Sequence, residues 1–219
     1  MLEIKELLDL TKTIAAPLFE GRTYPWEVLP DINDFIIELG NTLPEEEFEQ
    51  RSENVWVAKD ATVFPSAYIG SPCIIDHGAE VRHCAFIRGS AIIGKNTVVG
   101  NSTEIKNSIL FDNVQAPHYN YIGDSVLGYK SHMGAGSITS NVKSDKTLVV
   151  IKSCEGEIET KRKKVGAILG DGVEIGCNSV LNPGTILGRG ASVYPTSCVR
   201  GVIPENGIYK DKDNIVIRK

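Results

Sequence analysis

This 219-residue chain contains one histidine that could act in catalysis and two cationic residues whose spacing could let them bind an anion. His118 lies in the segment Ala116-Pro117-His118-Tyr119-Asn120-Tyr121-Ile122-Gly123-Asp124. An imidazole titrates near pH ~6.5, so it can accept a proton at neutral pH and act as a general base. The alternative is a structural histidine that hydrogen-bonds to the backbone at a corner of the fold.

Arg88 and Lys106 lie eighteen residues apart, in the segments Ile87-Arg88-Gly89 and Glu104-Ile105-Lys106-Asn107. If eighteen residues make one coil of a repeating fold, both side chains lie on the same edge of successive coils. Two stacked cations of this kind could hold an anion such as a phosphate. The alternative is a pair of solvated surface charges.

A six-residue period predicts the elements that must position these residues. Stepping by six reaches large apolar residues at Val57, Val63, Ile69, Ile75, Val81, Ile87, Ile93, Val99, Ile105 and Phe111, and again at Leu169, Ile175, Leu181, Leu187, Val193 and Val199. Small residues recur four positions after each of these apolar residues, and glycine often comes directly after the apolar residue. Strict self-similarity at six residues predicts a mainly β fold, a parallel β-helix with triangular coils of about 18 residues. The branched residues point inward, and stacking of neighbouring coils supplies the stability.

The chain divides into three regions on this reading. Residues 1–54 predict a helical N-terminal module, with a short amphipathic helix at the start, a second helix between Asp31 and Gly40, and a third that begins at Pro44. Residues 55–203 form the β-helix, and residues 204–219 form a C-terminal tail that runs along its surface.

Two irregularities interrupt the period. Near Pro117 the spacing shortens, because Ile122 follows Phe111 by eleven residues instead of twelve. Residues 142–166 leave the hexad pattern and contain two strand-like runs, which predict an inserted β-hairpin. Interruptions of a solenoid often emerge on its binding face.

Composition argues against several classes of protein. The net charge of −5 disfavours nucleic acid and anionic membranes as partners. No stretch approaches the ~20 apolar residues of a membrane-spanning helix, and the acidic start does not resemble a signal peptide. The cysteines are odd in number and lack a C-x-x-C pair, so we expect free buried thiols in a reducing compartment, at Cys73, Cys84, Cys154, Cys177 and Cys198. These features predict a cytoplasmic protein.

The segment around His118 and the next one, Met133-Gly134-Ala135-Gly136-Ser137-Ile138-Thr139-Ser140-Asn141, carry a family resemblance. They resemble the acetyltransferase half of the bacterial bifunctional glucosamine-1-phosphate acetyltransferase / N-acetylglucosamine-1-phosphate uridylyltransferase. They look closer still to archaeal sugar-1-phosphate nucleotidylyltransferases with an acetyltransferase tail, which have a similar basic hairpin before a segment matched by Lys164-Val165-Gly166-Ala167. The resemblance covers about residues 55–210 and implies a left-handed helix. Nothing resembles the glycine-rich loop of the uridylyltransferase half, so we expect acyl transfer alone.

The resemblance implies roles for three catalytic residues. The family histidine at the place of His118 takes a proton from the sugar amine as the amine attacks the acetyl thioester. A backbone N–H at the place of Ala135 stabilises the oxyanion, between two glycines that allow close approach. Asn141 matches an asparagine beside the thioester.

The resemblance also implies two sets of binding residues. Arg88 and Lys106 match the arginine and lysine that hold the sugar phosphate, Tyr121 matches a tyrosine at the sugar, and His132 stands where the family has an asparagine at the sugar. The acetyl-CoA set is implied to be Ala135, Asn141, Cys177, Pro195 and Lys212, of which Cys177 and Pro195 replace a family serine and alanine.

The function expected from this resemblance is acetyl-CoA-dependent N-acetylation of an amino-sugar 1-phosphate such as glucosamine 1-phosphate. We expect a homotrimer, with no tightly bound cofactor, no metal and no nucleic acid or membrane partner. Acetylation of another amino sugar or of a sugar hydroxyl is an alternative, and a non-catalytic scaffold is another. A γ-type carbonic anhydrase is disfavoured, because His77 and His83 are six residues apart and so lie on adjacent faces of one coil.

Overall fold

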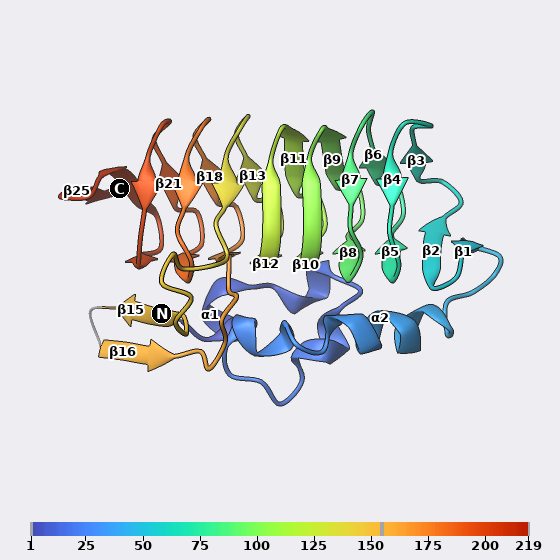
Figure 1. Ribbon diagram of the computed structural model, residues 1–219, viewed down its shortest axis with the longest axis horizontal. Helices are drawn as coiled ribbons and strands as arrows, with labels where there is room; N and C mark the ends of the chain where they lie inside the picture. The colour runs from blue at the N-terminus through green and yellow to red at the C-terminus, as the bar shows by residue number, and fades with distance from the viewer. Residues whose placement is uncertain (1, 154–155, 219) are drawn as a thin grey trace.

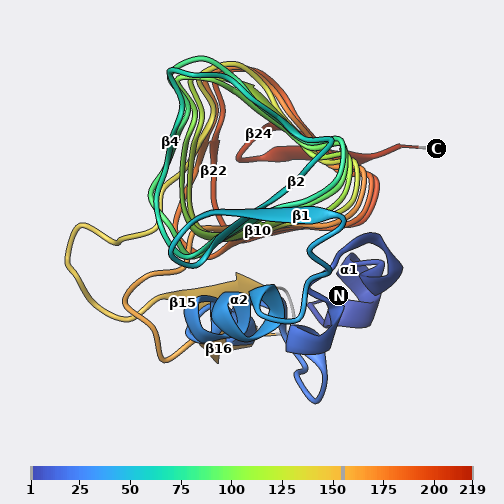
Figure 2. The same cartoon turned by 90° about the vertical axis from the view of Figure 1, so that its right-hand side faces the viewer.

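The computed structural model describes residues 2–153 and 156–218, and most of them form a parallel β-helix of triangular cross-section (Figure 2). Seen from its N-terminal end, the chain follows the lower face, then the rear face and then the front face, and it turns counterclockwise as it recedes (Figure 2). The helix is therefore left-handed, as the family resemblance implied. Figure 1 looks onto the front face, with the axis horizontal.

Each face is a stack of short parallel strands. The lower face contains β2 (Val55–Ala58), β5 (Cys73–Ile75), β8 (Ala91–Ile93), the ends of β10 (Glu104–Leu110) and β12 (Tyr121–Leu127), β17 (Ala167–Leu169), β20 (Thr185–Leu187) and β23 (Val202–Ile203). The front face contains β4 (Tyr68–Ile69), β7 (Phe86–Ile87), the beginnings of β10 and β12, β14 (Ile138–Thr139), β19 (Val180–Leu181) and β22 (Cys198–Val199). The rear face contains β3 (Thr62–Val63), β6 (Glu80–Val81), β9 (Val98–Asn101), β11 (Gln115–His118), β13 (His132–Met133), β18 (Glu174–Ile175), β21 (Ser192–Val193) and β24 (Gly207–Asp211).

The coil that leads to Phe111 is one residue shorter than the coil before it, and this changes the position of Phe111. Ile75 pairs with Ile93, eighteen residues later, but Ile93 pairs with Leu110, only seventeen residues later. Leu110 therefore takes the inward place that six-residue stepping assigns to Phe111, and that assignment was wrong. Phe111 lies in line with the glycines of the neighbouring coils, Gly94 and Gly128, and its ring packs edge-on against Phe19 at 5.8 Å.

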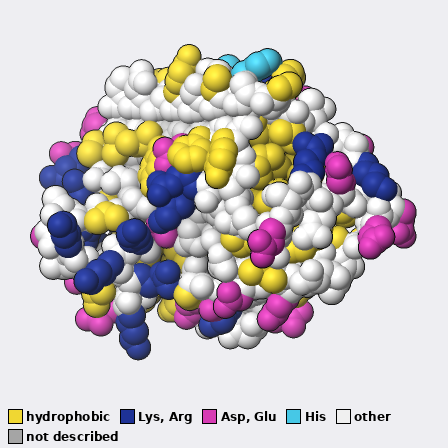
Figure 3. All heavy atoms as spheres, turned by 45° about the vertical axis from the view of Figure 1, so that its right-hand side comes forward, with side chains coloured by type: hydrophobic (Ala, Val, Ile, Leu, Met, Phe, Trp, Pro, Cys, Tyr) yellow, Lys and Arg dark blue, Asp and Glu magenta, His cyan; other side chains and the backbone are white. Residues whose placement is uncertain are grey.

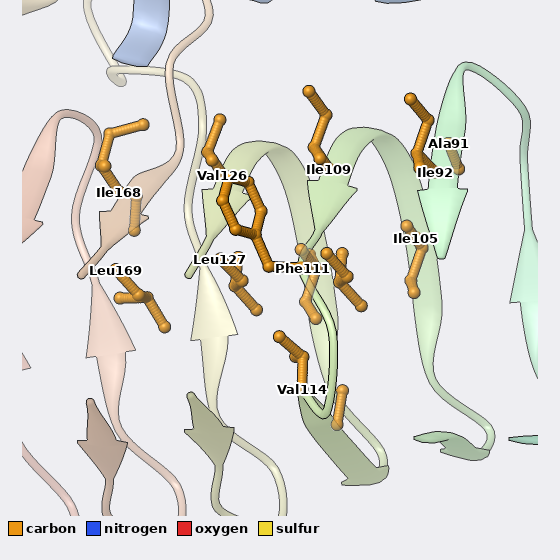
Figure 4. Close-up of a cluster of buried hydrophobic side chains, with 14 of the residues drawn as sticks. Ala91, Ile92, Ile105, Ile109, Phe111, Val114, Val126, Leu127, Ile168 and Leu169 are labelled. Carbon is orange, nitrogen blue, oxygen red and sulfur yellow. The ribbon is translucent and has the colours of Figure 1, made fainter. Parts of the chain in front are cut away.

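The lower face is buried on both sides. Its outward-pointing residues are almost inaccessible, and these are Trp56, Ile74, Ile92, Ile109, Val126, Ile168 and Ile186. Figure 4 shows Ile109 and Val126 side by side, with the Phe111 ring next to Val126. Strand sequences such as Cys73–Ile75 and Ala167–Leu169 are accordingly apolar without alternation, as is typical of strands covered on both faces.

An N-terminal module of short helices covers most of this face (Figure 1). It contains α1 (Ile4–Leu7), η1 (Leu10–Lys12), η2 (Ala16–Phe19), η3 (Pro25–Val28) and α2 (Ile32–Gly40). The predicted helix between Asp31 and Gly40 is confirmed, although the Asp31 side chain does not cap it and accepts a hydrogen bond from Arg22 at 2.6 Å instead.

The third predicted helix was wrong. Pro44 starts a single turn, in which its carbonyl accepts from the Phe48 N–H at 2.9 Å, and the chain then enters β1 (Phe48–Ser52), antiparallel to β2. The glutamates that follow Pro44 provide no apolar stripe for a helix to bury. Pairing with the first strand of the β-helix satisfies the backbone groups of this segment instead.

The insertion and the tail are both ordered strands. The predicted hairpin is confirmed as β15 (Val150–Ser153) and β16 (Gly156–Glu159), which lies under the lower face beside the module (Figure 1). The C-terminal residues do not simply run along the surface, because β24 pairs in parallel with β21 and extends the rear face, and β25 (Asn214–Ile217) then returns antiparallel to β24. Backbone hydrogen bonding to the last coil explains this difference.

The cysteines differ from the expectation that all are buried. Cys73 is buried, and burial raises the pKa of its thiol to about 12. Cys84, Cys177 and Cys198 are free and exposed, and Cys154 lies outside the described residues. These three cysteines lie at corners or at outward-pointing positions of the coils, not at inward-pointing ones.

In residues 2–153 and 156–218, no helix has the length and apolar character needed to cross a bilayer.

Candidate functional site

Four of the residues singled out by the family resemblance stack in one line along the corner between the rear and front faces. The Gly136 N–H donates to the His118 carbonyl at 3.0 Å, so Ala135 lies directly over His118 in the next coil. The Asn178 N–H donates to the Ala135 carbonyl and the Thr196 N–H to the Cys177 carbonyl, both at 2.8 Å, which continues the line to Cys177 and Pro195. We call this line of His118, Ala135, Cys177 and Pro195 the corner column.

The corner column extends toward the C-terminal end of the helix. Tyr209 pairs with Val193, so the turn after β24 stacks over the turn that contains Pro195. This turn holds Lys212, which is exposed. Residues that are up to 94 positions apart in the sequence therefore line one edge of the molecule.

His118 is held by its backbone, and its ring is exposed. Its N–H donates to the side-chain oxygen of Asn120 at 3.2 Å, and Tyr119 between them has a φ of 51°. Asn120 is buried and donates to the Gly134 carbonyl at 2.8 Å and to the Ser137 carbonyl at 3.1 Å, which ties the corner to the next coil. The imidazole makes no hydrogen bond to any residue that the structure describes, so it is not a structural histidine bonded to the backbone.

Ala135 presents a backbone donor in the next coil. The Gly134 N–H donates to the Ile175 carbonyl and the Gly136 N–H to His118, whereas the Ala135 N–H has no hydrogen-bond partner within residues 2–153 and 156–218. A Cβ on Gly134 would approach the Ile175 carbonyl oxygen to 2.5 Å, so the sequence needs glycine there for close stacking. Ala135 is half-exposed, and an N–H without a partner among the described residues is suited to stabilise an oxyanion.

Arg88 and Lys106 occupy the same edge of successive coils, as their spacing predicts, because the Arg88 N–H donates to the Ile105 carbonyl at 2.8 Å. Each cation faces a carboxylate. The Arg88 guanidinium lies 2.9 Å from Glu104, and the Lys106 ammonium lies 3.4 Å from Asp124. An anionic ligand must therefore compete with these two carboxylates.

Asp124 is the centre of a hydrogen-bond cluster at the lower edge of the front face. Its buried carboxylate accepts from Asn107 at 2.9 Å and from Asn141 at 2.5 Å, in addition to the contact with Lys106. The Asn141 amide also donates to the Tyr121 hydroxyl at 3.2 Å. Three successive coils thus contribute to one polar cluster.

Tyr121 remains a neutral phenol in this cluster. Burial raises its pKa, and the negative charges of Asp124 and Glu104 raise it further. Its hydroxyl hydrogen is therefore retained at neutral pH and can be donated to a ligand on the front face.

His132 lies apart from the other sugar-binding candidates. It is on the rear face, where its Nδ1 contacts the Glu174 carboxylate at 2.8 Å, whereas Tyr121 and the two cations are on the front face. Within one chain the structure does not bring His132 to the cluster around Asp124.

Sequence reasoning missed Glu104, Asn107, Asn120 and Asp124 as parts of the site. Asp124 ends the segment His118–Asp124, and Glu104 stands two residues before Lys106, so both were in view without an assigned role. For Glu104 and Asp124, the signal is an acidic side chain that faces a candidate cation of the preceding coil.

Part of the chain is similar in sequence to known proteins. Residues 69–187 match the model of the GMPPB C-terminal domain. A bifunctional protein GlmU of Methanococcus maripaludis is 35% identical over 114 residues, which are 51% of this chain and 27% of the relative. A bifunctional sugar-1-phosphate nucleotidylyltransferase/acetyltransferase of Sulfurisphaera tokodaii is 33% identical over 92 residues, 42% of this chain and 23% of the relative. The matched region thus spans about a quarter of the length of these relatives.

Among solved structures, the polySia-specific acetyltransferase NeuO has a TM-score of 0.48 at 14% identity, with 73% of this chain and 79% of that chain covered.

Proposed function

The chain belongs to the family of the GMPPB C-terminal domain, and from this premise we propose that it is an acetyl-CoA-dependent N-acetyltransferase for an amino-sugar 1-phosphate such as glucosamine 1-phosphate. The observation that supports this proposal most strongly is the corner column. It places the exposed imidazole of His118 next to the unpaired N–H of Ala135, with Cys177 and Pro195 in line beyond them. A base, an oxyanion donor and a run of backbone groups for an extended thioester are thereby collected on one edge.

In the proposed reaction, the acceptor nitrogen attacks the acetyl carbonyl of acetyl-CoA and a C–N bond forms. His118 takes the proton that the nitrogen loses, and the Ala135 N–H donates to the oxyanion. The C–S bond then breaks, and the imidazolium returns its proton to the departing CoA thiolate. Asn141 is the proposed contact to the thioester.

The acceptor is proposed to lie on the front face. Its phosphate displaces Glu104 from Arg88 and binds Lys106 beside Asp124, while the Tyr121 hydroxyl contacts the sugar. The Arg88–Glu104 pair is largely exposed, so exchange of its carboxylate for a phosphate is feasible in water. The Lys106 ammonium has its buried carboxylate at 3.4 Å, a long contact that leaves its other protons free for a phosphate oxygen.

We also propose that the chain acts as a homotrimer with each site between two neighbouring subunits. The position of His132 on the rear face supports this, because a role at the sugar then requires the rear face of one subunit to meet the front face of another. Light scattering should give three times the 23.8 kDa chain mass, and a fully active monomer would contradict it.

An acetyl-CoA consumption assay tests the function. The panel contains glucosamine 1-phosphate, galactosamine 1-phosphate, glucosamine 6-phosphate, glucosamine and a neutral sugar that offers only hydroxyls. The 1-phosphates should give the highest kcat/KM. Preference for an unphosphorylated amino sugar, or for a hydroxyl acceptor, would replace the proposed substrate class, and inactivity on every acceptor would favour a non-catalytic scaffold.

A further inference from the structure

A cavity of about 430 Å³ lies between the N-terminal module and the hairpin, away from the corner column. Its walls come from η3 and from the end of β16 with the residues that follow. Figures 1 and 2 show that β16 lies below the lower face. The corner column runs along the opposite edge of the triangular section. We propose that this cavity binds a nucleoside phosphate, with the base on the module side and the phosphates on the hairpin side.

The module side supplies an aromatic wall. Tyr24 and Trp26 are stacked, with ring centroids 4.5 Å apart and planes inclined by 6°, and both line the cavity. Trp26 is buried and packs against the half-buried Tyr24, so the accessible Tyr24 ring is held in place. Aromatic side chains of this kind bind nucleobases by stacking, without a requirement for one particular base.

The hairpin side supplies unpaired cations. The Nε of Arg162 is buried and has no hydrogen-bond partner among the residues that the structure describes. Lys161 also lines the cavity, and no carboxylate of residues 2–153 or 156–218 forms an ion pair with either side chain. Arg162 as a whole is half-buried, so the rest of its guanidinium remains open to a ligand. A buried N–H without a partner is costly, and a phosphate oxygen at this side chain would supply a charge-assisted hydrogen bond.

The charges around the cavity favour an anion. Arg22 on the module side is held by Asp31 at 2.6 Å, and Glu27 is turned to the backbone, where it accepts from the Thr23 and Tyr24 N–H groups. The Glu159 carboxylate is exposed and makes no side-chain hydrogen bond or ion pair with the residues that the structure describes, so it should oppose a phosphate.

The insertion of residues 142–166, which contains the hairpin, is basic, unlike the rest of this acidic chain. Residues 142–166 contain seven Lys or Arg and four Asp or Glu, although the net charge of the chain is −5. Figure 3 shows Lys and Arg side chains gathered at the lower left, the side on which Figure 1 places the hairpin. Such a local excess attracts anions to the mouth of the cavity.

Isothermal titration calorimetry with ADP, UDP and inorganic pyrophosphate tests the proposal on the full chain, in the presence of saturating acetyl-CoA. We expect saturable binding of both nucleotides, tighter than that of pyrophosphate. Arg162→Ala should weaken all three probes at least tenfold, with partial recovery in Arg162→Lys. Tyr24→Ala should weaken the nucleotides much more than pyrophosphate.

Two further variants keep the test independent of misfolding. Glu159→Gln should tighten nucleotide binding, an effect that loss of structure cannot produce. Lys152→Ala, whose cation is paired with Glu157 at 2.9 Å and does not line the cavity, should bind as the wild type does. Binding that is abolished by acetyl-CoA, or that is equal in wild type and Arg162→Ala, would overturn the proposal, as would no binding at millimolar nucleotide.

Discussion

Asn141 donates a hydrogen bond to the carboxylate of Asp124, which precedes it by seventeen residues and lies in the neighbouring coil. The same carboxylate also accepts a hydrogen bond from Asn107 and pairs with the Lys106 ammonium, and both of these residues lie in the preceding coil. Asp124 therefore holds together two residues that the family resemblance assigns to different substrates, Lys106 to the sugar phosphate and Asn141 to the thioester. A change at this carboxylate should disturb both.

Asp124→Asn should lower the free energy of unfolding by about 3 kcal/mol, since hydrogen bonds to a charged group contribute ~1.5–3 kcal/mol and the amide would turn an N–H toward other donors. Urea unfolding followed by circular dichroism measures this. Asp145→Asn is the matched control, because that carboxylate is exposed in the segment that precedes the hairpin and its removal should change stability by less than ~0.5 kcal/mol. Equal stability of both variants and the wild type would show that the cluster does not stabilise the coils.

His118→Ala should lower kcat by about 10²–10⁴-fold, because removal of a positioned base has effects of that size. The KM for acetyl-CoA should change little, since the proposed contacts of the cofactor are to backbone groups of later coils. His83→Ala is a control, because that histidine also is exposed but its ring packs against Phe64 at 4.3 Å. A His118→Ala enzyme with the kcat of the wild type would exclude His118 as the base.

Arg88→Ala and Lys106→Ala should each raise the KM for an amino-sugar 1-phosphate roughly tenfold or more, because each removes a charge-assisted contact to the phosphate. The unphosphorylated amino sugar should be affected much less. Arg82→Ala removes a comparable cation–carboxylate pair from the rear face, with Glu80, and should leave both KM values unchanged. If the KM values for the two acceptors rise equally in Arg88→Ala and in Lys106→Ala, the phosphate binds elsewhere.

Phe111→Ala should lower the free energy of unfolding by about 3–5 kcal/mol, because the ring is fully buried between the coil and Phe19 and its loss leaves a cavity. Phe86→Ala removes a ring that is 42% exposed on the front face and should have a much smaller effect. Denaturant titration of both proteins measures the difference. A small effect at Phe111 would mean that the module does not depend on this contact.

Asp76 makes the stability depend on pH. Its carboxyl is buried and burial raises its pKa, while one of its oxygens has no hydrogen-bond partner in the described part of the chain. A raised pKa means that the folded state favours the protonated acid. The stabilisation is therefore fully present below the pKa of the unfolded chain and is lost as pH rises through the folded pKa.

Asp76→Asn should remove this dependence, because the amide stays neutral and its oxygen can still accept from the His77 N–H. The variant should be more stable than the wild type at pH 7, and the two should converge toward pH 4. Urea unfolding at a series of pH values tests this, with Asp34→Asn on the exposed side of α2 as the control. A difference that is independent of pH would show that the carboxylate is not the cause.

The sequence by itself determined the parts that depend on local patterns. The spacing of apolar residues from Val57 to Ile105 requires inward side chains at every sixth position, and only a β-helix places them so. The hairpin and α2 were also predictable, because turn residues and apolar periods act within about ten residues. The motif that starts at His118 identified the family from the residue types alone.

The tertiary structure decided what depends on register between coils. A coil shortened by one residue exchanges the roles of Leu110 and Phe111, and a count along the chain cannot locate the residue that is left out. The 25 residues of the insertion separate Ala135 from Cys177 in sequence, but they loop out, so that backbone hydrogen bonds stack these two residues over His118. Asp124 likewise acquires its partners from coils before and after it, because the contacts that build this site run along the helix axis, across the direction of the chain.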